Sequence, residues 1–222
     1  MTAPAAGRLA VAAGSSLRGA RVPAGAWEVL QRHGEAAAYV LPHRIDHVAN
    51  LRALAGAGCD RVLAIGSVGG LHAELGPGTI LVPDDFVALD AAPASALEGE
   101  AAHRTAGFDP EWRQAVLEAL ADAGIEARDT GTYWQASGPR LETPAEIRLI
   151  AAHAEVIGMT IASECVAACE LGLSYAALCV VDNLANGVAG KRLSVDELEA
   201  NRARNRKRLE DALTLTLPRL AG

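Results

Sequence analysis

Aromatic side chains are scarce in this chain of 222 residues, at 4%, and long apolar runs are absent. No stretch approaches the roughly 20 apolar residues of a membrane-spanning helix, and the first residues lack the pattern of a secretion signal. Lys and Arg number 20 against 27 Asp and Glu, so no broad basic surface for nucleic acid is expected. We therefore expect a cytoplasmic protein that binds neither membranes nor nucleic acid.

Cysteine is also rare. The four cysteines, Cys59, Cys165, Cys169 and Cys179, lie in apolar stretches without a CxxC pair or a histidine at zinc-ligand spacing. Cys165 and Cys169 are four residues apart on an expected helix, but further ligands are missing. We predict reduced core thiols and no metal site.

Short apolar runs alternate with segments of helical periodicity. We expect strands at residues 9–13, 27–30, 61–65, 79–82, 130–134, 156–157 and 175–181. We expect helices at residues 46–57, 110–124, 163–171 and 195–217, and one that starts after a capping-box pattern at Thr143, with residues 90–109 as a loop. This alternation predicts a single α/β domain over residues 1–222, with a mixed, largely parallel sheet flanked by helices.

Small residues follow three of the expected strands, at residues 14–16, 66–70 and 158–160. In open α/β sheets ligands bind beyond the carboxyl ends of the strands, so these turns predict an anion pocket. The alternative is that each glycine only permits a tight turn. Neither GxGxxG nor GxxxxGK[ST] occurs, so no dinucleotide or P-loop nucleotide is specified. The arginines near the end, Arg202 among them, predict a solvated helix face.

Four segments, at residues 41–51, 66–86, 138–147 and 156–164, resemble the trimeric purine nucleoside phosphorylase and methylthioadenosine phosphorylase family. The most specific of them read GPRLETPAEI and VIGMTIASE. The resemblance implies cleavage of a purine nucleoside by inorganic phosphate into free purine and pentose 1-phosphate. It also implies a homotrimer that needs no metal or organic cofactor. The stretch between Ser15 and Arg32 is shorter than in that family.

By this resemblance, phosphate is bound by Ser15, Arg32, His33, the backbone of Ser67, and Thr160. Hydroxyls, amides and a guanidinium are suitable phosphate donors, and the guanidinium adds a positive charge and a planar fork. For Arg32 and His33 alone, the competing interpretation is an exposed polar turn.

The resemblance also implies that Leu141 packs on the purine while Glu142 and Asn183 hydrogen-bond its edge. A carboxylate accepts from the N1–H of a 6-oxopurine, a donor that adenine lacks, so the pair favours hypoxanthine or guanine. From this resemblance we expect Asn183 to stabilise charge at purine N7, and Asp182 either to help to protonate N7 or to orient its neighbour. The competing interpretations are an acid at a helix start for Glu142 and a turn residue for Asn183.

Against the sugar, the family pattern implies Tyr133 and Met159, for which a core position is the alternative. Val195 at the 5′ end is apolar and suits a methylthio group better than a hydroxyl. We therefore expect phosphorolysis of methylthioinosine, inosine or guanosine. A methylthioadenosine phosphorylase, a hydrolytic nucleosidase and a catalytically silent purine- or phosphate-binding protein remain as alternatives.

Overall fold

The computed structural model describes residues 7–34, 38–89, 91, 94–190 and 193–222, and of Val195 the backbone alone. The strands are β1 (Leu9–Ala13), β2 (Glu28–Gln31), β3 (Arg61–Gly70), β4 (Ile80–Leu81), β5 (Asp85–Val87), β6 (Thr132–Gln135), β7 (Val156–Gly158) and β8 (Ser174–Leu184). The helices are α1 (His47–Gly56), α2 (Pro110–Asp122), α3 (Pro144–Ile150), α4 (Ile161–Glu170) and α5 (Val195–Leu220). Short 3-10 turns are η1 (Ser15–Leu17), η2 (Pro42–Arg44), η3 (Gly99–Ala102) and η4 (Val188–Gly190).

In this part of the chain the strands form one sheet in the order β2-β1-β3-β7-β6-β5, with β8 paired to β3 and β4 paired to β8. The β3–β7 and β4–β8 pairs are antiparallel, whereas the others are parallel. This confirms the expected mixed, largely parallel sheet. Within the described ranges, no helix has the length and apolarity that a bilayer crossing requires.

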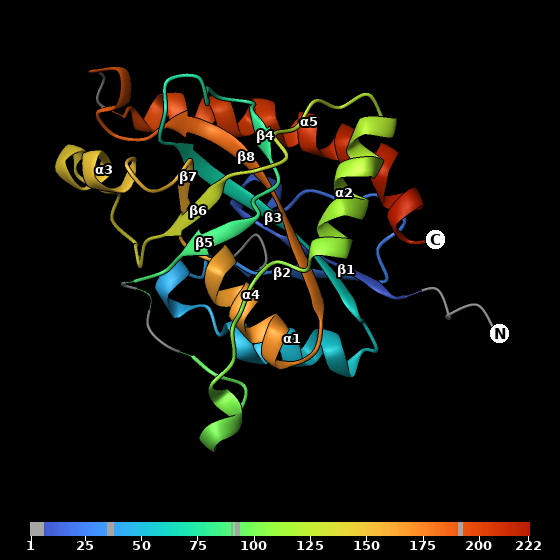
Figure 1. Cartoon of the computed structure of the whole chain (residues 1–222). Helices are drawn as coiled ribbons and strands as arrows, with labels where there is room; N and C mark the ends of the chain where they lie inside the picture. Colours follow the sequence, from blue (N-terminus) through green and yellow to red (C-terminus); the bar gives the residue numbers. More distant parts are fainter. Residues whose placement is uncertain (1–6, 35–37, 90, 92–93, 191–192) are drawn as a thin grey trace.

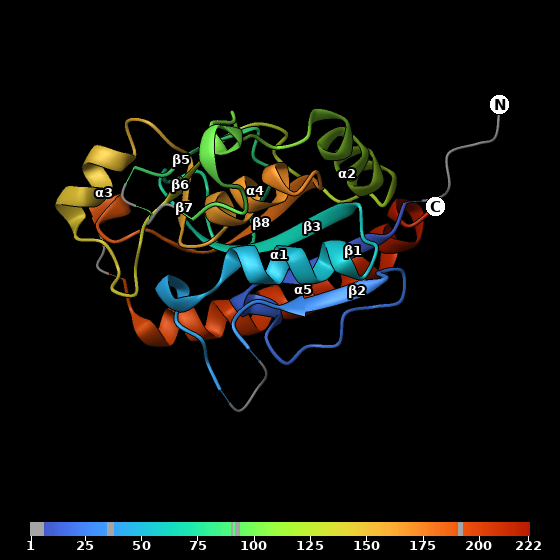
Figure 2. The ribbon, with the colours of Figure 1, turned by 90° about the horizontal axis from the view of Figure 1, so that it is seen from below.

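Both faces of the sheet are covered by helices, because successive side chains of a strand point to opposite faces. In β1, Ala10 and Ala12 pack on the side of α1 and α4, whereas Leu9 and Val11 pack on the side of α2 and α5. Figures 1 and 2 show α1 and α5 on opposite sides of the sheet. Coverage on both faces explains why β3 and β8 read as continuous apolar runs.

The predicted capping box starts α3 as expected. The backbone N–H of Glu146 donates to Thr143 Oγ1 at 3.3 Å, and Thr143 N–H donates to Glu146 Oε2 at 2.7 Å. Arg140 pairs with the same carboxylate, and these donors lower the pKa of Glu146 to about 2. The start of α3 is therefore held in place next to residues 141 and 142.

Two parts of the prediction are wrong. Residues 66–70 do not form a turn but extend β3, with an irregularity in register between Val68 and Gly69. Their glycines instead permit close packing, since a Cβ on Gly70 would overlap the carbonyl oxygen of Leu75. The sequence also misses β5, whose three residues are too few for a periodicity.

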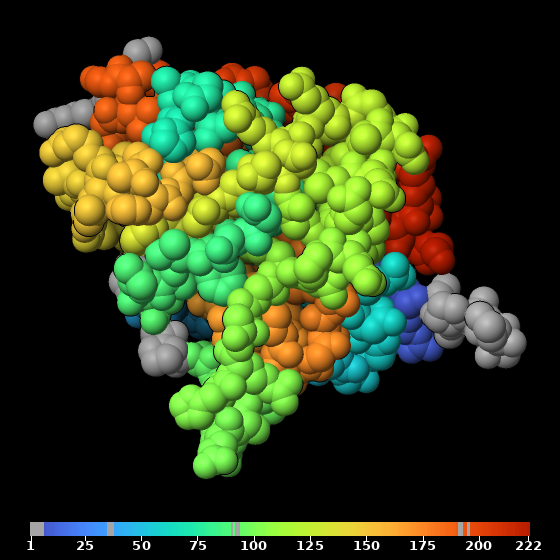
Figure 3. Space-filling model, in the orientation of Figure 1, coloured from blue at the N-terminus to red at the C-terminus, as the bar shows by residue number. Residues whose placement is uncertain are grey.

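The expected loop at residues 90–109 contains η3, which projects from the rest of the surface in Figure 3. Residues 90, 92 and 93 of that loop lie outside the described residues.

One edge of β3 changes partner along its length. β1 pairs with β3 as far as Ala64, and β7 joins the same strand at Gly69 and Gly70. The gap between these two partners, at residues 65–68, forms a fork in the sheet. Gly14 lies against this gap, since a Cβ there would overlap the carbonyl oxygen of Ile65. Such switch points are where open α/β sheets bind ligands.

We predict that Gly14→Ala destabilises the protein by about 1–3 kcal/mol, because the added methyl group meets backbone that cannot rotate away. Urea unfolding followed by circular dichroism measures this change. Gly107→Ala is the matched control, since a Cβ there meets nothing within 4 Å. Equal unfolding midpoints for the two variants would show that the fork is not closely packed.

Candidate active site

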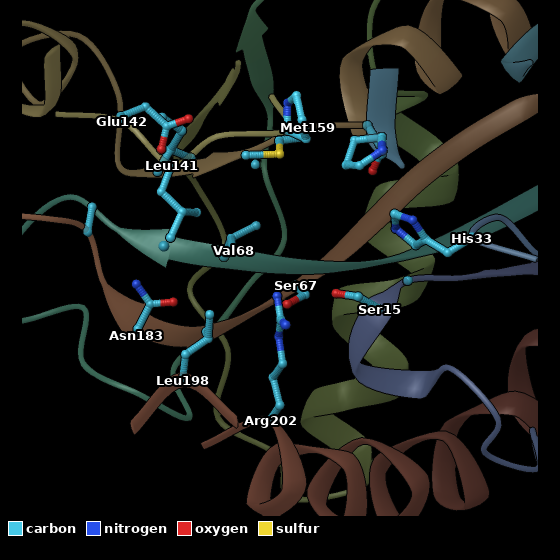
Figure 4. A pocket seen from close by; sticks show the side chains of 18 of the residues that line it. Ser15, His33, Ser67, Val68, Leu141, Glu142, Met159, Asn183, Leu198 and Arg202 are labelled. Atoms are coloured by element: carbon cyan, nitrogen blue, oxygen red, sulfur yellow. The ribbon is translucent and has the colours of Figure 1, made fainter. Parts of the chain in front are cut away.

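A pocket opens at the fork, and Figure 4 shows its lining. The predicted site residues that line it are Ser15, Arg32, His33, Ser67, Leu141, Glu142, Met159, Thr160 and Asn183. In Figure 4, Leu141, Glu142 and Asn183 lie at one end, and Ser15 and His33 lie at the other. The pocket thus has one end with an apolar side chain, a carboxylate and an amide, and another end with hydroxyl and imidazole groups.

Thr160 stands at the residue before α4, where the helix N-terminus adds partial positive charge. Its Oγ1 accepts a hydrogen bond from Arg32 Nη1 at 3.1 Å, so its own O–H is left to donate elsewhere. Ser15 follows β1 in η1, and its hydroxyl makes no hydrogen bond with any described residue. Two hydroxyls are therefore available as donors at this end of the pocket.

Arg32 is almost fully buried, and both of its Nη atoms already have protein partners. Nη2 donates to Glu164 Oε2 at 2.7 Å and to the Ala12 carbonyl at 3.1 Å, and Nη1 also reaches the Ile65 carbonyl at 3.2 Å. The sequence prediction of a free phosphate fork did not include these partners. The charge of Arg32 is therefore balanced by a buried carboxylate.

The Arg32–Glu164 pair remains ionised. Burial raises the pKa of Glu164, but Arg32 and His47 outweigh burial, so that the net pKa is lowered. Burial lowers the pKa of Arg32, but the Glu164 carboxylate, together with Tyr175 and Tyr133, raises it, so that the net pKa is raised. The Tyr175 hydroxyl donates to Glu164 Oε2 at 2.8 Å and completes the cluster.

His33 is neutral at pH 7, because burial lowers its pKa by more than the hydrogen bond to the Val40 carbonyl raises it, and the charge of Arg32 lowers it further. That carbonyl lies 3.0 Å from Nδ1 and can only accept, so Nδ1 carries the proton. Nε2 then holds a lone pair. The ring also stacks on Tyr39, with 5.0 Å between the centroids.

Three predicted site residues are not placed in the pocket. Asp182 is 1% exposed, and its oxygens accept hydrogen bonds from Ser16, Ser67, Asn205 and Arg202. Tyr133 is also buried, and its hydroxyl accepts from the backbone N–H groups of Thr160 and Ile161. Val195 begins α5, but its side chain lies outside the described part of the structure.

Part of the pocket lining is not among the residues predicted from the sequence. Arg202 is predicted on a solvated helix face, yet it lines the pocket together with the buried Leu198. The two residues are four apart and so share a face of α5, a spacing that would have indicated this role. Asn186 also lines the pocket, and its side chain donates to the backbone carbonyl of Glu142 at 3.1 Å.

No three His, Cys, Asp or Glu side chains gather to hold a metal ion in the part of the chain that the structure describes. Cys59, Cys165 and Cys179 are buried free thiols and Cys169 is a partly buried one, as predicted.

We predict that Glu164→Gln lowers the free energy of unfolding by about 3–5 kcal/mol, because it leaves the buried charge of Arg32 without a counter-charge. Urea unfolding measures the loss, with the exposed Glu126→Gln as control. The folded-state pKa of Glu164 lies below its ordinary value of 4.5, so its contribution is present above that pH and is lost as pH falls through the folded-state pKa. The unfolding free energy of Glu164→Gln should lack this pH-dependent contribution. An unchanged midpoint and acid profile would contradict the ion pair.

The chain matches the family described as the phosphorylase superfamily over residues 17–217. A relative from Archaeoglobus fulgidus, named probable 6-oxopurine nucleoside phosphorylase, is 38% identical over 171 residues, which are 77% of this chain and 70% of the relative. A relative from Methanocaldococcus jannaschii, named probable S-methyl-5′-thioinosine phosphorylase, is 37% identical over 174 residues, covering 77% of this chain and 68% of the relative.

Among solved structures, methylthioadenosine phosphorylase from Schistosoma mansoni in complex with adenine superposes with a TM-score of 0.85 at 20% identity, over 95% of this chain and 90% of that one. At that identity the superposition shows the fold. The extent of the family match, together with the relatives at 37% and 38% identity, shows that the chain belongs to the phosphorylase superfamily.

Proposed function

We propose that this chain is a phosphorylase of 6-oxopurine nucleosides, which transfers a pentosyl group from a purine to inorganic phosphate. The observation that carries the proposal is the division of the pocket, with Glu142 and Asn183 at one end and Ser15 and His33 at the other. Recognition of a nucleoside needs groups that hydrogen-bond to the edge of the purine, and recognition of phosphate needs several hydrogen-bond donors. The names of the relatives from A. fulgidus and M. jannaschii support the same reaction.

In the proposed reaction the bond between C1′ and the purine nitrogen N9 breaks, and its electron pair goes to the purine. An oxygen of phosphate then forms the new bond to C1′, so no side-chain nucleophile is needed. Asn183 uses one N–H to donate to the Leu184 carbonyl at 2.7 Å, which orients its amide at the base end. Its remaining polar atoms stabilise the charge that develops at N7. Asp182, buried beneath the pocket, acts as a support for Ser67 and Arg202.

At the donor-rich end, Thr160 and Ser15 donate hydroxyl hydrogens to phosphate oxygens. Neutral His33 accepts from a P–OH group through Nε2, and Arg32 holds Thr160 in place from behind. Met159 lies between the two ends in Figure 4, where it would contact the sugar. Tyr133 acts indirectly, because its hydroxyl accepts a hydrogen bond from the backbone N–H of Thr160 and so holds Thr160 in position.

The proposed base is a 6-oxopurine because Glu142 lines the base end, held through its backbone by Asn186, while the half-exposed Leu141 covers the purine face. The buried Leu198, one turn after Val195 on α5, keeps the neighbouring wall apolar and favours a methylthio group at the 5′ carbon. The homotrimeric state, the cytoplasmic location and the need for no cofactor beyond phosphate as co-substrate are part of the proposal.

The test of function is release of free base from inosine, guanosine, methylthioinosine and methylthioadenosine, each with and without phosphate. We expect phosphate-dependent release of hypoxanthine, fastest from methylthioinosine. Release without phosphate would indicate a nucleosidase, and fastest release from methylthioadenosine would indicate the 6-amino specificity. If purines stabilise the protein thermally but no base is released, the chain is a binding protein.

We predict that Glu142→Gln reduces the preference for inosine over adenosine by about tenfold to a hundredfold, since an amide can both accept from and donate to N1. The measurement is kcat/KM for the two nucleosides. Glu126→Gln removes an exposed carboxylate away from the pocket and should leave the ratio unchanged. An unaltered ratio in Glu142→Gln would remove Glu142 from base recognition.

A further inference from the structure

Two arginines line the pocket in the described residues, and they differ in what their guanidinium groups still have to offer. Arg32 is 3% exposed, and its Nη atoms donate to Glu164, Thr160 and two backbone carbonyls. A ligand could gain hydrogen bonds from these Nη atoms only by displacing protein partners. Its buried Nε has no hydrogen-bond partner among the described residues, so Arg32 shapes the pocket with one unpaired N–H and without a free pair of donors.

Arg202 is differently placed. Its side chain is 40% exposed and rises from α5, and its Nε lies 3.4 Å from Asp182 Oδ2. Neither of its Nη atoms has a hydrogen-bond partner among the described residues. In Figure 4 its guanidinium lies beside Ser67, with Ser15 nearby. The open edge of this guanidinium thus stands next to the hydroxyl end of the pocket.

Asp182 explains why the guanidinium stays there. Its Oδ1 accepts from Asn205 Nδ2 at 2.7 Å, and its Oδ2 accepts from Ser16 at 2.9 Å and from Ser67. With these donors already in place, the carboxylate balances the charge of Arg202 without engaging its Nη atoms. The Nε contact is longer than the usual charge-assisted distance of about 2.7–2.9 Å, so it orients the side chain and leaves it able to shift toward a ligand.

We infer that Arg202 binds the anionic oxygens of phosphate through its two Nη atoms. Two parallel N–H donors suit a tetrahedral oxyanion, and a guanidinium keeps its charge at every working pH. This inference rests on the proposed function, because it assigns a role in the same site to the arginine whose Nη atoms have no partner among the described residues. The other source of anionic or polar oxygen near α5 is the 5′ substituent of the nucleoside, and the experiment separates the two.

The test compares wild type with Arg202→Gln in two measurements. The first is thermal stabilisation by inorganic phosphate alone, without nucleoside, which needs no turnover. The second is the KM for phosphate at saturating inosine, beside the KM for inosine and for methylthioinosine at saturating phosphate. Gln retains an N–H for Asp182, so the buried carboxylate keeps a donor.

We expect Arg202→Gln to raise the KM for phosphate by at least about tenfold and to weaken stabilisation by phosphate to the same extent, while both nucleoside KM values change little. Arg202→Lys keeps the positive charge but loses the pair of parallel N–H donors. Its KM for phosphate should lie between the values for wild type and for Arg202→Gln. Arg202→Lys also serves as the second variant if Arg202→Gln does not fold. The control is Arg204→Gln, an exposed charge on the same helix that is not in the pocket lining.

The outcomes separate the inference from the proposed function. An unchanged phosphate response in Arg202→Gln, or no response in wild type, overturns the inference even if wild type releases base. A rise in KM for one nucleoside alone, dependent on its 5′ group, also overturns it and assigns Arg202 to the sugar. In a further outcome, wild type releases no base but is stabilised by phosphate, and only the Arg202 variants lose this stabilisation. The anion site then stands and the proposed catalysis fails.

Discussion

The buried contacts of Arg32 hold the fork of the sheet together. From the residue after β2, this one side chain reaches the carbonyl of Ala12 in β1, the carbonyl of Ile65 in β3, and Glu164 in α4. The two carbonyls have a donor at the point where the sheet changes partner, and the carboxylate has a counter-charge. A buried ion pair such as Arg32–Glu164 need not add to the net free energy of unfolding, but removing one partner leaves a buried charge unpaired and destabilises the protein. The Thr160 hydroxyl, at the hydroxyl end of the pocket, is also anchored to this group.

A second buried group repeats the arrangement at the other side of the fork. Asp182 accepts from Ser16 in η1, Ser67 in β3, and Asn205 in α5. A buried carboxylate and a buried guanidinium thus flank the same four residues of β3. The Asp182 carboxylate and the Arg32 guanidinium each have hydrogen-bond partners from distant segments of the chain. These partners fix the orientation of each side chain. The hydroxyls, the imidazole and Arg202 are arranged on a scaffold of fixed polar contacts, which suits an anion of fixed shape.

The sequence predicts the parts of this molecule whose signal is local. The apolar runs of β3 and β8 and the capping box of Thr143 and Glu146 follow from period and spacing, and the structure confirms them. The glycines after Ile65 are ambiguous, because glycine serves turns and close strand packing alike. The Arg32–Glu164 pair joins residues with no sequence relation to each other. Arg202 carried a local signal, its spacing from Leu198, but the charges around it favoured a solvent face.

The pairing of β3 with β8 has a consequence for how the chain reaches this structure. Ser174 pairs with Arg61, so one edge of the long apolar strand β3 stays without its partner β8 until the chain has been made beyond Ser174. Pairings between such distant segments form slowly, since closing the intervening loop costs entropy before any contact repays it. During synthesis the apolar edge of β3 is open to other chains and to chaperones. The pocket, whose lining extends to α5, exists only after that last strand has docked.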